Sequence, residues 1–247
     1  MGNLGSESLY DYQKNLTSHS GSINNIENKV IQFTTSIEED NIKNEDIRIS
    51  INTNRYVSYY FWKGVLDRVL AVLGLIITLP IFLLVAILIK FSSRGPILFK
   101  QERIGINSKS FKIYKFRTML TNAPNVPTNS MKNDKNYVTK IGSILRKLSI
   151  DEMPQLINIL KGEMSFIGPR PMIKDHQYLI KMRQLKGIDI LKPGISGLAQ
   201  INGRDEITDR EKFKYDQQYL EDFNIKTDIK VLIKTVSKVL RKEDISI

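Results

Sequence analysis

Two adjacent acidic residues, Asp151 and Glu152, are the part of this chain best suited to chemistry. They follow Arg146 and Ser149, where the spacing predicts the start of a helix. A helix N-terminus and nearby cations favour ionised carboxylates, which act as nucleophiles or Mg²⁺ ligands. The same spacing fits a purely structural capping box with Glu152 as the capping acid, and spacing alone favours that role. Pro154 would then fall at the fifth helical position and cost a hydrogen bond, which indicates a shaped site.

Several cations stand where they could contact an anion. Arg170 lies between two prolines in the loop 168–171, and a planar guanidinium on so stiff a loop suits a diphosphate. A turn with a surface arginine is the alternative. Lys115 and Arg117 alternate on one face of a predicted strand, although a solvated strand end also carries cations. Arg204 ends a glycine-bearing loop that lacks a phosphate-loop or dinucleotide fingerprint.

The elements that must position these residues are mostly helices. Residues 96–101 and 111–117 predict two strands of a hairpin. Helical patterns follow at 140–148, 149–162, 172–186, 212–223 and 225–241. The last is amphipathic and basic, which fits a helix in a membrane interface and a helix packed on a soluble core equally well. The sequence therefore predicts an α/β fold that is mostly helical, with a small β-hairpin.

An uncharged apolar run of 21 residues, Val69–Ile89, decides where the protein works. At about 1.5 Å per residue it could just cross a hydrocarbon core of about 30 Å. Pro80 near its centre predicts a break or kink, and both flanks are basic, which the positive-inside rule assigns to the cytoplasmic side. We expect a re-entrant helix–break–helix in the cytoplasmic leaflet, with Pro80 as the membrane break. An ordinary kinked transmembrane helix is the alternative.

Charge is unevenly distributed over the 247 residues. Residues 1–50 carry a net charge of −4, so the formal charge of +11 leaves +15 on the remainder. A basic body beside an apolar anchor indicates anionic membrane lipid or a phosphorylated substrate rather than nucleic acid, for which no recognition motif is present. The chain has no cysteine and two histidines, which excludes thiolate chemistry, disulfides and a histidine metal cluster. Residues 1–50 contain no apolar core of a cleavable signal.

These patterns divide the chain into three regions. Residues 1–53 are expected to be a disordered polar extension, and residues 54–94 to form the re-entrant membrane helix and its flanks. Residues 95–247 are expected to form a cytoplasmic catalytic domain that ends in the amphipathic helix.

Five stretches, in order between about residues 63 and 240, resemble the bacterial sugar transferase family, the small monotopic polyprenyl-phosphate phosphoglycosyl transferases. They are Asp67-Arg68, Tyr114–Met119, Leu148–Leu156, Asn158–Pro171 and Lys192–Arg204. The resemblance implies transfer of a sugar phosphate from a UDP-sugar to polyprenyl (undecaprenyl) phosphate, with release of UMP. Such a step initiates assembly of a surface polysaccharide or glycoconjugate. The resemblance also implies a re-entrant helix at the cytoplasmic face of the bacterial inner membrane.

The resemblance assigns roles to residues that match its motifs. It implies that Asp151 is the nucleophile and that Glu152 supports Mg²⁺ or the nucleophile, so both are expected metal ligands. It implies phosphate or nucleotide contacts for Arg146, Arg170 and Arg204, and it makes Lys115 a further functional position, which we expect to bind substrate. Many members carry Ser-Pro at the membrane break, where this chain has Leu79-Pro80, and Thr78 could replace the serine by bonding back within its own helix.

Two other functions remain open at this point. A membrane-tethered binding protein without catalysis would explain the charge and the anchor, but not an acidic pair and a Pro-Arg-Pro loop in one short stretch. An enzyme could also use both acids as metal ligands and let the acceptor phosphate attack the donor directly. The sequence does not name the sugar, and it leaves a homo-oligomer open.

Overall fold

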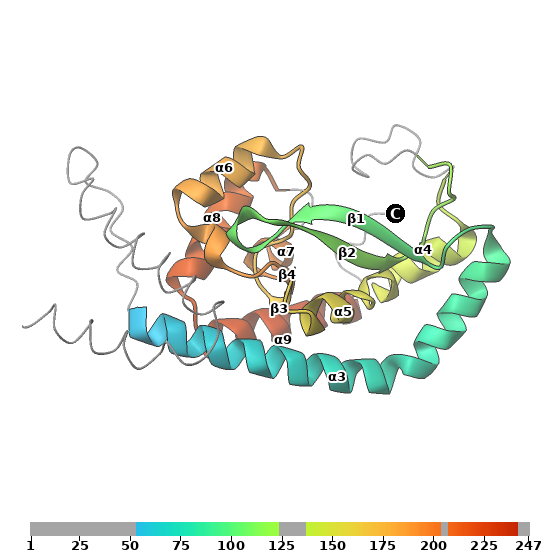
Figure 1. The fold of residues 1–247 in the computed structure, drawn as a ribbon, viewed down its shortest axis with the longest axis horizontal. Coiled ribbons are helices and arrows are strands. Elements are labelled where there is room, and N and C mark those ends of the chain that lie inside the picture. The colour runs from blue at the N-terminus through green and yellow to red at the C-terminus, as the bar shows by residue number, and fades with distance from the viewer. Residues whose placement is uncertain (1–52, 124–136, 204–206, 242–247) are drawn as a thin grey trace, which may run out of the picture. The chain divides into compact units, whose positions relative to one another are not determined.

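The structure, a computed structural model, describes residues 53–123, 137–203 and 207–241. Within these ranges the chain is mostly helical with two small sheets, as the sequence predicts (Figure 1). Residues from Ser58 onward belong to one compact unit. Residues 1–52 of the predicted polar extension lie outside the described residues, so that prediction stays untested.

Residues Thr53–Ser92 form one long helix, α3, and Pro80 lies inside it. The expected break is therefore a bend: the helix is continuous, and its second half curves away from its first (Figure 1). Proline removes the hydrogen bond to the carbonyl of Ile76. Thr78 does bond back, because its hydroxyl donates to the carbonyl of Gly74 at 2.6 Å. That carbonyl is not the one that Pro80 leaves without a donor, so the bond favours the bend without replacing the lost contact.

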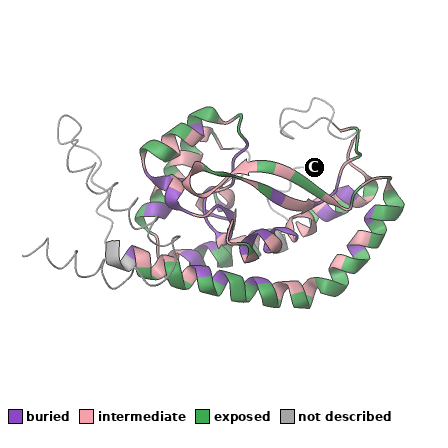
Figure 2. Ribbon diagram, viewed as in Figure 1, coloured by how far each residue is buried: buried purple, intermediate pink, exposed green. Residues whose placement is uncertain are grey.

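One narrow stripe of α3 is buried, and the rest of its apolar surface is exposed (Figure 2). Ala71, Val85 and Ile89 are at most 4% exposed, whereas Ile77 is 74% and Phe91 88% exposed. The core helix of a soluble protein would be buried on most sides. Among the described residues, α3 from Tyr56 to Ser92 is the one helix long and apolar enough to cross a membrane.

Two apolar clusters pack against this stripe. The first joins Ala71 to strand β2 (Ser110–Phe116) and to the short helix α5 (Gln155–Leu160), through Ile113, Leu156, Ile159 and Met164. The second joins the C-terminal half of α3 to β2 and to α4 (Lys140–Lys147), through Val85, Ile89, Phe116 and Leu145. The rest of the unit therefore lies along α3 rather than at one of its ends.

The predicted hairpin is confirmed. Strands β1 (Leu98–Ile104) and β2 (Ser110–Phe116) pair antiparallel, with Gln101 opposite Ile113. A second sheet pairs β3 (Ser165–Ile167) with β4 (Gly194–Ser196) in parallel. Residues 193–200 predict a loop and then a short strand, in the region where β4 lies. No local pattern predicts β3, because a strand of three residues is too short to show alternation.

The remaining helices follow the predicted order with shifted ends. Helix α6 begins at Gln177 rather than at 172, because Met172 bridges to Ile104 of β1 instead. Helix α8 begins at a full capping box, formed by Thr208 and Glu211. This capping box is not among the predicted features. The other bounds are α6 Gln177–Leu185, α7 Leu198–Ile201, α8 Asp209–Glu221 and α9 Ile225–Arg241, with 3₁₀ turns η1 Ile106–Ser108, η4 Ile150–Glu152 and η5 Ile188–Ile190.

Helix α9 turns its apolar stripe outward. Val231 and Asp228 are buried, while the side chains of the predicted stripe that are described are 46–63% exposed, namely Ile225, Ile229, Leu232, Ile233 and Val236. The stripe is therefore not packed on the core, which was one of the two alternatives for this helix. An exposed apolar stripe between lysines is typical of a helix in a membrane interface.

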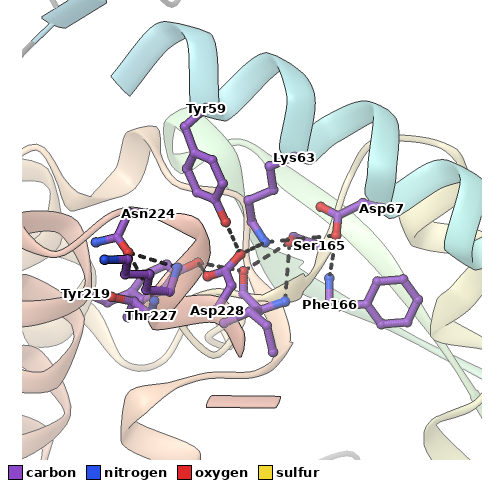
Figure 3. A network of polar contacts seen from close by, with 11 residues as sticks. Tyr59, Lys63, Asp67, Ser165, Phe166, Tyr219, Asn224, Thr227 and Asp228 are labelled. Carbon is purple, nitrogen blue, oxygen red and sulfur yellow. Dashed lines mark hydrogen bonds and ion pairs between the residues drawn. The ribbon is translucent and has the colours of Figure 1, made fainter. Parts of the chain in front are cut away.

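The buried carboxylate of Asp228, on α9, is hydrogen-bonded to the first part of α3 and to α8 (Figure 3). Asp228 Oδ2 accepts from the Tyr59 hydroxyl at 2.7 Å and from Lys63 Nζ at 2.5 Å, and Oδ1 accepts from the Tyr219 hydroxyl at 2.6 Å. Asp228 is 8% exposed, and three donors offset the cost of burying its charge. Nearby on α3, Asp67 accepts from the backbone N–H of Phe166 at 3.4 Å, which links the helix to β3.

A buried amide fixes α5 against the hairpin. Asn158 is fully buried, and its Oδ1 accepts from the backbone N–H of Tyr114 at 3.1 Å. Its Nδ2 donates to the backbone carbonyl of Lys112 and to Glu163 Oε2, each at 2.7 Å. Because β1 covers only one edge of β2, the amide takes the place of a strand partner on the other edge. This contact sets how α5 and the residues before it lie relative to β2.

Replacing Asn158 by leucine should lower the free energy of unfolding by about 2–6 kcal/mol, because a backbone N–H and a carbonyl would lose their partners at about 1–3 kcal/mol each. Denaturant unfolding of the full chain in detergent measures the change. Gln218→Leu, at an exposed amide on α8, is the matched control and should stay within about 0.5 kcal/mol of wild type. Equal losses in the two variants would contradict a specific role for the Asn158 amide.

Candidate active site

Asp151 and Glu152 lie in the single 3₁₀ turn η4, not at the start of an α-helix. Ser149 adopts a left-handed conformation, with φ of 55°, and its side chain makes no capping bond. The predicted capping box is therefore wrong. Pro154 does not interrupt a helix either, because it is the N-cap of α5. Helix capping, the structural explanation that spacing favoured, does not account for this acidic pair.

The acidic turn is held by an apolar cluster to which α3 contributes. Ile150, the residue before Asp151, packs against the cluster that contains Val85 and Ile89 of α3. At its other end the turn leads through Pro154 into α5, which the Asn158 amide holds on β2. The carboxylate pair therefore follows directly after a residue that packs on the apolar cluster of α3, β2 and α4.

The same arrangement brings one predicted cation to the acids. Lys115 of β2 lies with Nζ 2.6 Å from Glu152 Oε1, and the two side chains are only 21% and 12% exposed. A pair so little exposed is screened less than a surface ion pair. Arg146 ends α4 just before the turn, and its Nε donates to Thr118 Oγ1 at 3.0 Å. Lys115 and Arg146 thus flank the acidic turn from a strand and from a helix end.

Arg117 has contacts unlike those expected of a substrate-binding residue. It is 6% exposed, and its Nη2 donates to the carbonyl and the hydroxyl of Ser93 at 2.7 and 2.9 Å. Its Nη1 donates to the carbonyl of Arg94 at 3.1 Å. These are carbonyls at the C-terminal end of α3, so the guanidinium caps the helix where the chain turns toward β1. Gly95 follows with φ of 127°, and a Cβ there would lie 2.2 Å from Arg117 Nη1, so the turn needs glycine.

The remaining predicted cations stand on other segments. Arg170 lies on the loop after β3, between the buried Pro169 and Pro171. Arg204 lies outside the described residues. Lys192, from the same motif as Arg204, stacks on the Tyr60 ring with Nζ 5.4 Å from its centroid. Burial and the Arg68 guanidinium lower the pKa of Lys192 to about 8.

Sequence reasoning assigned no role to Asn158, Arg183 or Asp216. Asn158 did leave a signal, because it is the one polar side chain among four apolar ones from Leu156 to Leu160. Arg183 donates through Nε and Nη2 to Asp216 Oδ2, at 3.0 and 2.6 Å. These two residues are 33 positions apart, and nothing local to either one indicates the pair.

The described residues contain no group of three or more His, Asp or Glu side chains that could hold a metal ion by themselves. Mg²⁺ seldom needs such a group, since it is usually bound by one or two carboxylates together with substrate phosphates. Asp151 and Glu152 fit that donor set.

Comparison with known proteins agrees with these features. Residues 58–242 match the family described as bacterial sugar transferase. The chain is 40% identical over 183 residues to the uncharacterized sugar transferase EpsL of Bacillus subtilis, covering 74% of this chain and 89% of that protein. It is 38% identical over 188 residues to the exopolysaccharide production protein ExoY of Sinorhizobium fredii, covering 70% and 83%.

A longer relative has a named reaction. The chain is 42% identical over 182 residues to the UDP-glucose:undecaprenyl-phosphate glucose-1-phosphate transferase of Escherichia coli, covering 70% of this chain and 39% of that enzyme. The match to the family spans most of the described residues and includes the acidic turn, the hairpin and α3. This chain belongs to the bacterial sugar transferase family.

Proposed function

We propose that this protein transfers a sugar phosphate from a UDP-sugar to polyprenyl phosphate and releases UMP, the first step of a surface polysaccharide or glycoconjugate. One observation carries the proposal: the Asp151–Glu152 turn packs, through Ile150, against the apolar cluster that joins β2 and α4 to Val85 and Ile89 of α3. A carboxylate pair at that place can serve a water-soluble donor and an acceptor whose phosphate is tied to the lipid. The family membership and the reaction in the name of the E. coli relative support it.

The chemistry proceeds in two displacements at one phosphorus. An Asp151 carboxylate oxygen attacks the phosphorus that bears the sugar, and the bond from that phosphorus to the bridging oxygen of the diphosphate breaks, so UMP leaves with that oxygen. A phosphate oxygen of polyprenyl phosphate then attacks the same phosphorus, and the Asp151 carboxylate leaves. Lys115 and Arg146 lie beside the turn, where they can hold phosphate oxygens through both steps.

Glu152 has a role different from that of Asp151 in the proposed reaction. Its carboxylate pairs with Lys115, which keeps that ammonium beside the acidic turn. The two acids are also the expected Mg²⁺ ligands, and Mg²⁺ supplies neutralisation of the diphosphate charge when bound. Because described residues offer only these two carboxylates to one ion, phosphate oxygens of the substrate would complete its ligands.

The packing of α3 supports attachment to one leaflet. The cytoplasmic domain contacts α3 from Ala71 to Ile89, a length of about 27 Å at about 1.5 Å per residue. A bilayer-spanning α3 would carry Lys115 and Glu152 into hydrocarbon, where each charged group costs about 2.5–3.5 kcal/mol or more. A helix that enters and leaves by the cytoplasmic face avoids this cost, and the outward stripe of α9 adds a second apolar contact with lipid.

Both ends of α3 should lie on the cytoplasmic side. The chain has no native cysteine, so single cysteines at the exposed Ser58 and Arg94 can be introduced without background. On intact cells an impermeant thiol reagent should label neither position, and both should react once the cells are opened. A cysteine at the exposed Lys174 of the catalytic domain is the control for the inner side. Labelling of one α3 end alone in intact cells would mean a spanning helix.

Asp151→Asn should lower kcat by at least about a thousandfold, the scale seen when a covalent nucleophile is removed. Glu152→Gln should be severe but should keep the attacking atom, and Asp175→Asn, at an exposed acid, should be neutral. With a UDP-sugar and no lipid acceptor, wild type should release up to one UMP per site. It should retain a base-labile adduct, and peptide mapping should find that adduct on Asp151.

Two outcomes would contradict the assignment of Asp151. No adduct under rapid quench, with full turnover once undecaprenyl phosphate is added, would favour direct attack by the acceptor and make both acids metal ligands. An adduct mapped to another residue would place the nucleophile elsewhere.

A further inference from the structure

The backbone of the Pro-Arg-Pro loop is held from several sides. Four consecutive carbonyls, at residues 169–172, each accept a hydrogen bond from a different group. The backbone N–H of Gly194 donates to Pro169 at 2.9 Å, and the backbone N–H of Ile104 donates to Met172 at 2.7 Å. The carbonyl of Arg170 accepts from Arg183 Nη1 at 2.9 Å, and the carbonyl of Pro171 from Arg103 Nη1 at 3.4 Å. These four bonds therefore hold the backbone of Arg170 in a fixed place.

Arg183 is the contact that reaches Arg170 itself. While Nη1 holds the Arg170 carbonyl, Nε and Nη2 both donate to Asp216 Oδ2 on α8, at 3.0 and 2.6 Å. The Asp216 side chain is 3% exposed and that of Arg183 is 11% exposed. One guanidinium thus joins the loop to α6 and α8, two helices that lie side by side in Figure 1.

Stability alone does not account for a buried pair of this kind. Burial raises the pKa of Asp216 although the Arg183 guanidinium opposes the shift, so desolvation of the carboxylate is the larger effect. Apolar residues of similar volume often stabilise a core as well as such a pair or better. Apolar residues have no donor, however, and cannot hold a backbone carbonyl in a fixed direction. Lysine cannot do it either, because a single ammonium does not present the fork that reaches two acceptors on opposite sides.

We propose that Arg183 and Asp216 are positioning residues for donor binding, which hold the Arg170 backbone so that its side chain meets the diphosphate of the UDP-sugar. This inference rests on the proposed function. Asp216 orients the Arg183 guanidinium, and Arg183 orients Arg170 through its carbonyl. Neither touches the donor, so their effect on catalysis passes through Arg170 alone.

The test is a donor titration of the full chain with undecaprenyl phosphate, measuring UMP release. Arg183→Lys should raise the donor KM about tenfold with kcat within about twofold, the pattern of lost uniform binding. The double change Arg183→Met with Asp216→Leu removes both buried charges together, so it should fold and raise KM by a similar factor. Lys174→Met, just beyond the loop in a half-exposed ion pair with Glu102, is the control and should change neither constant.

The decisive arm combines Arg183→Lys with Arg170→Ala. If Arg183 acts through Arg170, the combined variant should have the KM of Arg170→Ala alone, because the two changes remove one interaction. Multiplied effects, or a donor KM within about twofold of wild type in Arg183→Lys, would overturn the inference and leave the proposed function standing. An unchanged KM in Arg170→Ala would remove the donor role of Arg170 and the inference with it. Wild type that releases no UMP from any UDP-sugar would instead refute the proposed function, and the inference that depends on it.

Discussion

The site depends on one side-chain amide. Asn158 occupies the open edge of β2, where a third strand would otherwise sit, and it satisfies a backbone N–H and a carbonyl there. This fixes α5 on the hairpin, and α5 in turn fixes the acidic turn that precedes it. Lys115 reaches Glu152 because both elements are joined at this point. Without the amide, apolar packing alone would hold α5 to β2, and such packing specifies direction poorly.

The long helix is held by charges at both ends and by apolar contacts between them. A buried carboxylate, Asp228, accepts from Tyr59 and Lys63 in its first part, and a buried guanidinium, Arg117, caps its last carbonyls. Between these points only one stripe of α3 touches the domain, which leaves the opposite apolar surface for lipid. In the proposed reaction this arrangement keeps the acidic turn in water and within reach of an acceptor held in the membrane.

Sequence patterns predicted correctly the elements that depend on interactions between neighbouring residues. Alternation gave the hairpin, the 3.6-residue period gave α9 with its bounds, and Gly162 at φ of 77° ends α5 as expected. The motif Ser149–Glu152 misled because it is locally identical to a capping box, yet Pro154 begins the helix only afterwards. Arg117 is on the predicted strand face, but its partners are carbonyls of Ser93 and Arg94, just after α3 and more than 20 residues away. The Arg183–Asp216 pair has no local signal at all, since only the packing of α6 on α8 brings it together.

Identifying the released nucleotide by chromatography tests the central claim most directly. The intact chain would be incubated with a panel of UDP-sugars and undecaprenyl phosphate, and the nucleotide and the lipid product would be quantified together. Transfer of a sugar phosphate predicts UMP, in equal amount to a lipid-linked diphosphate sugar, and no UDP. Release of UDP with a lipid-linked monophosphate sugar would show that the sugar alone is transferred, and it would contradict attack at phosphorus by Asp151.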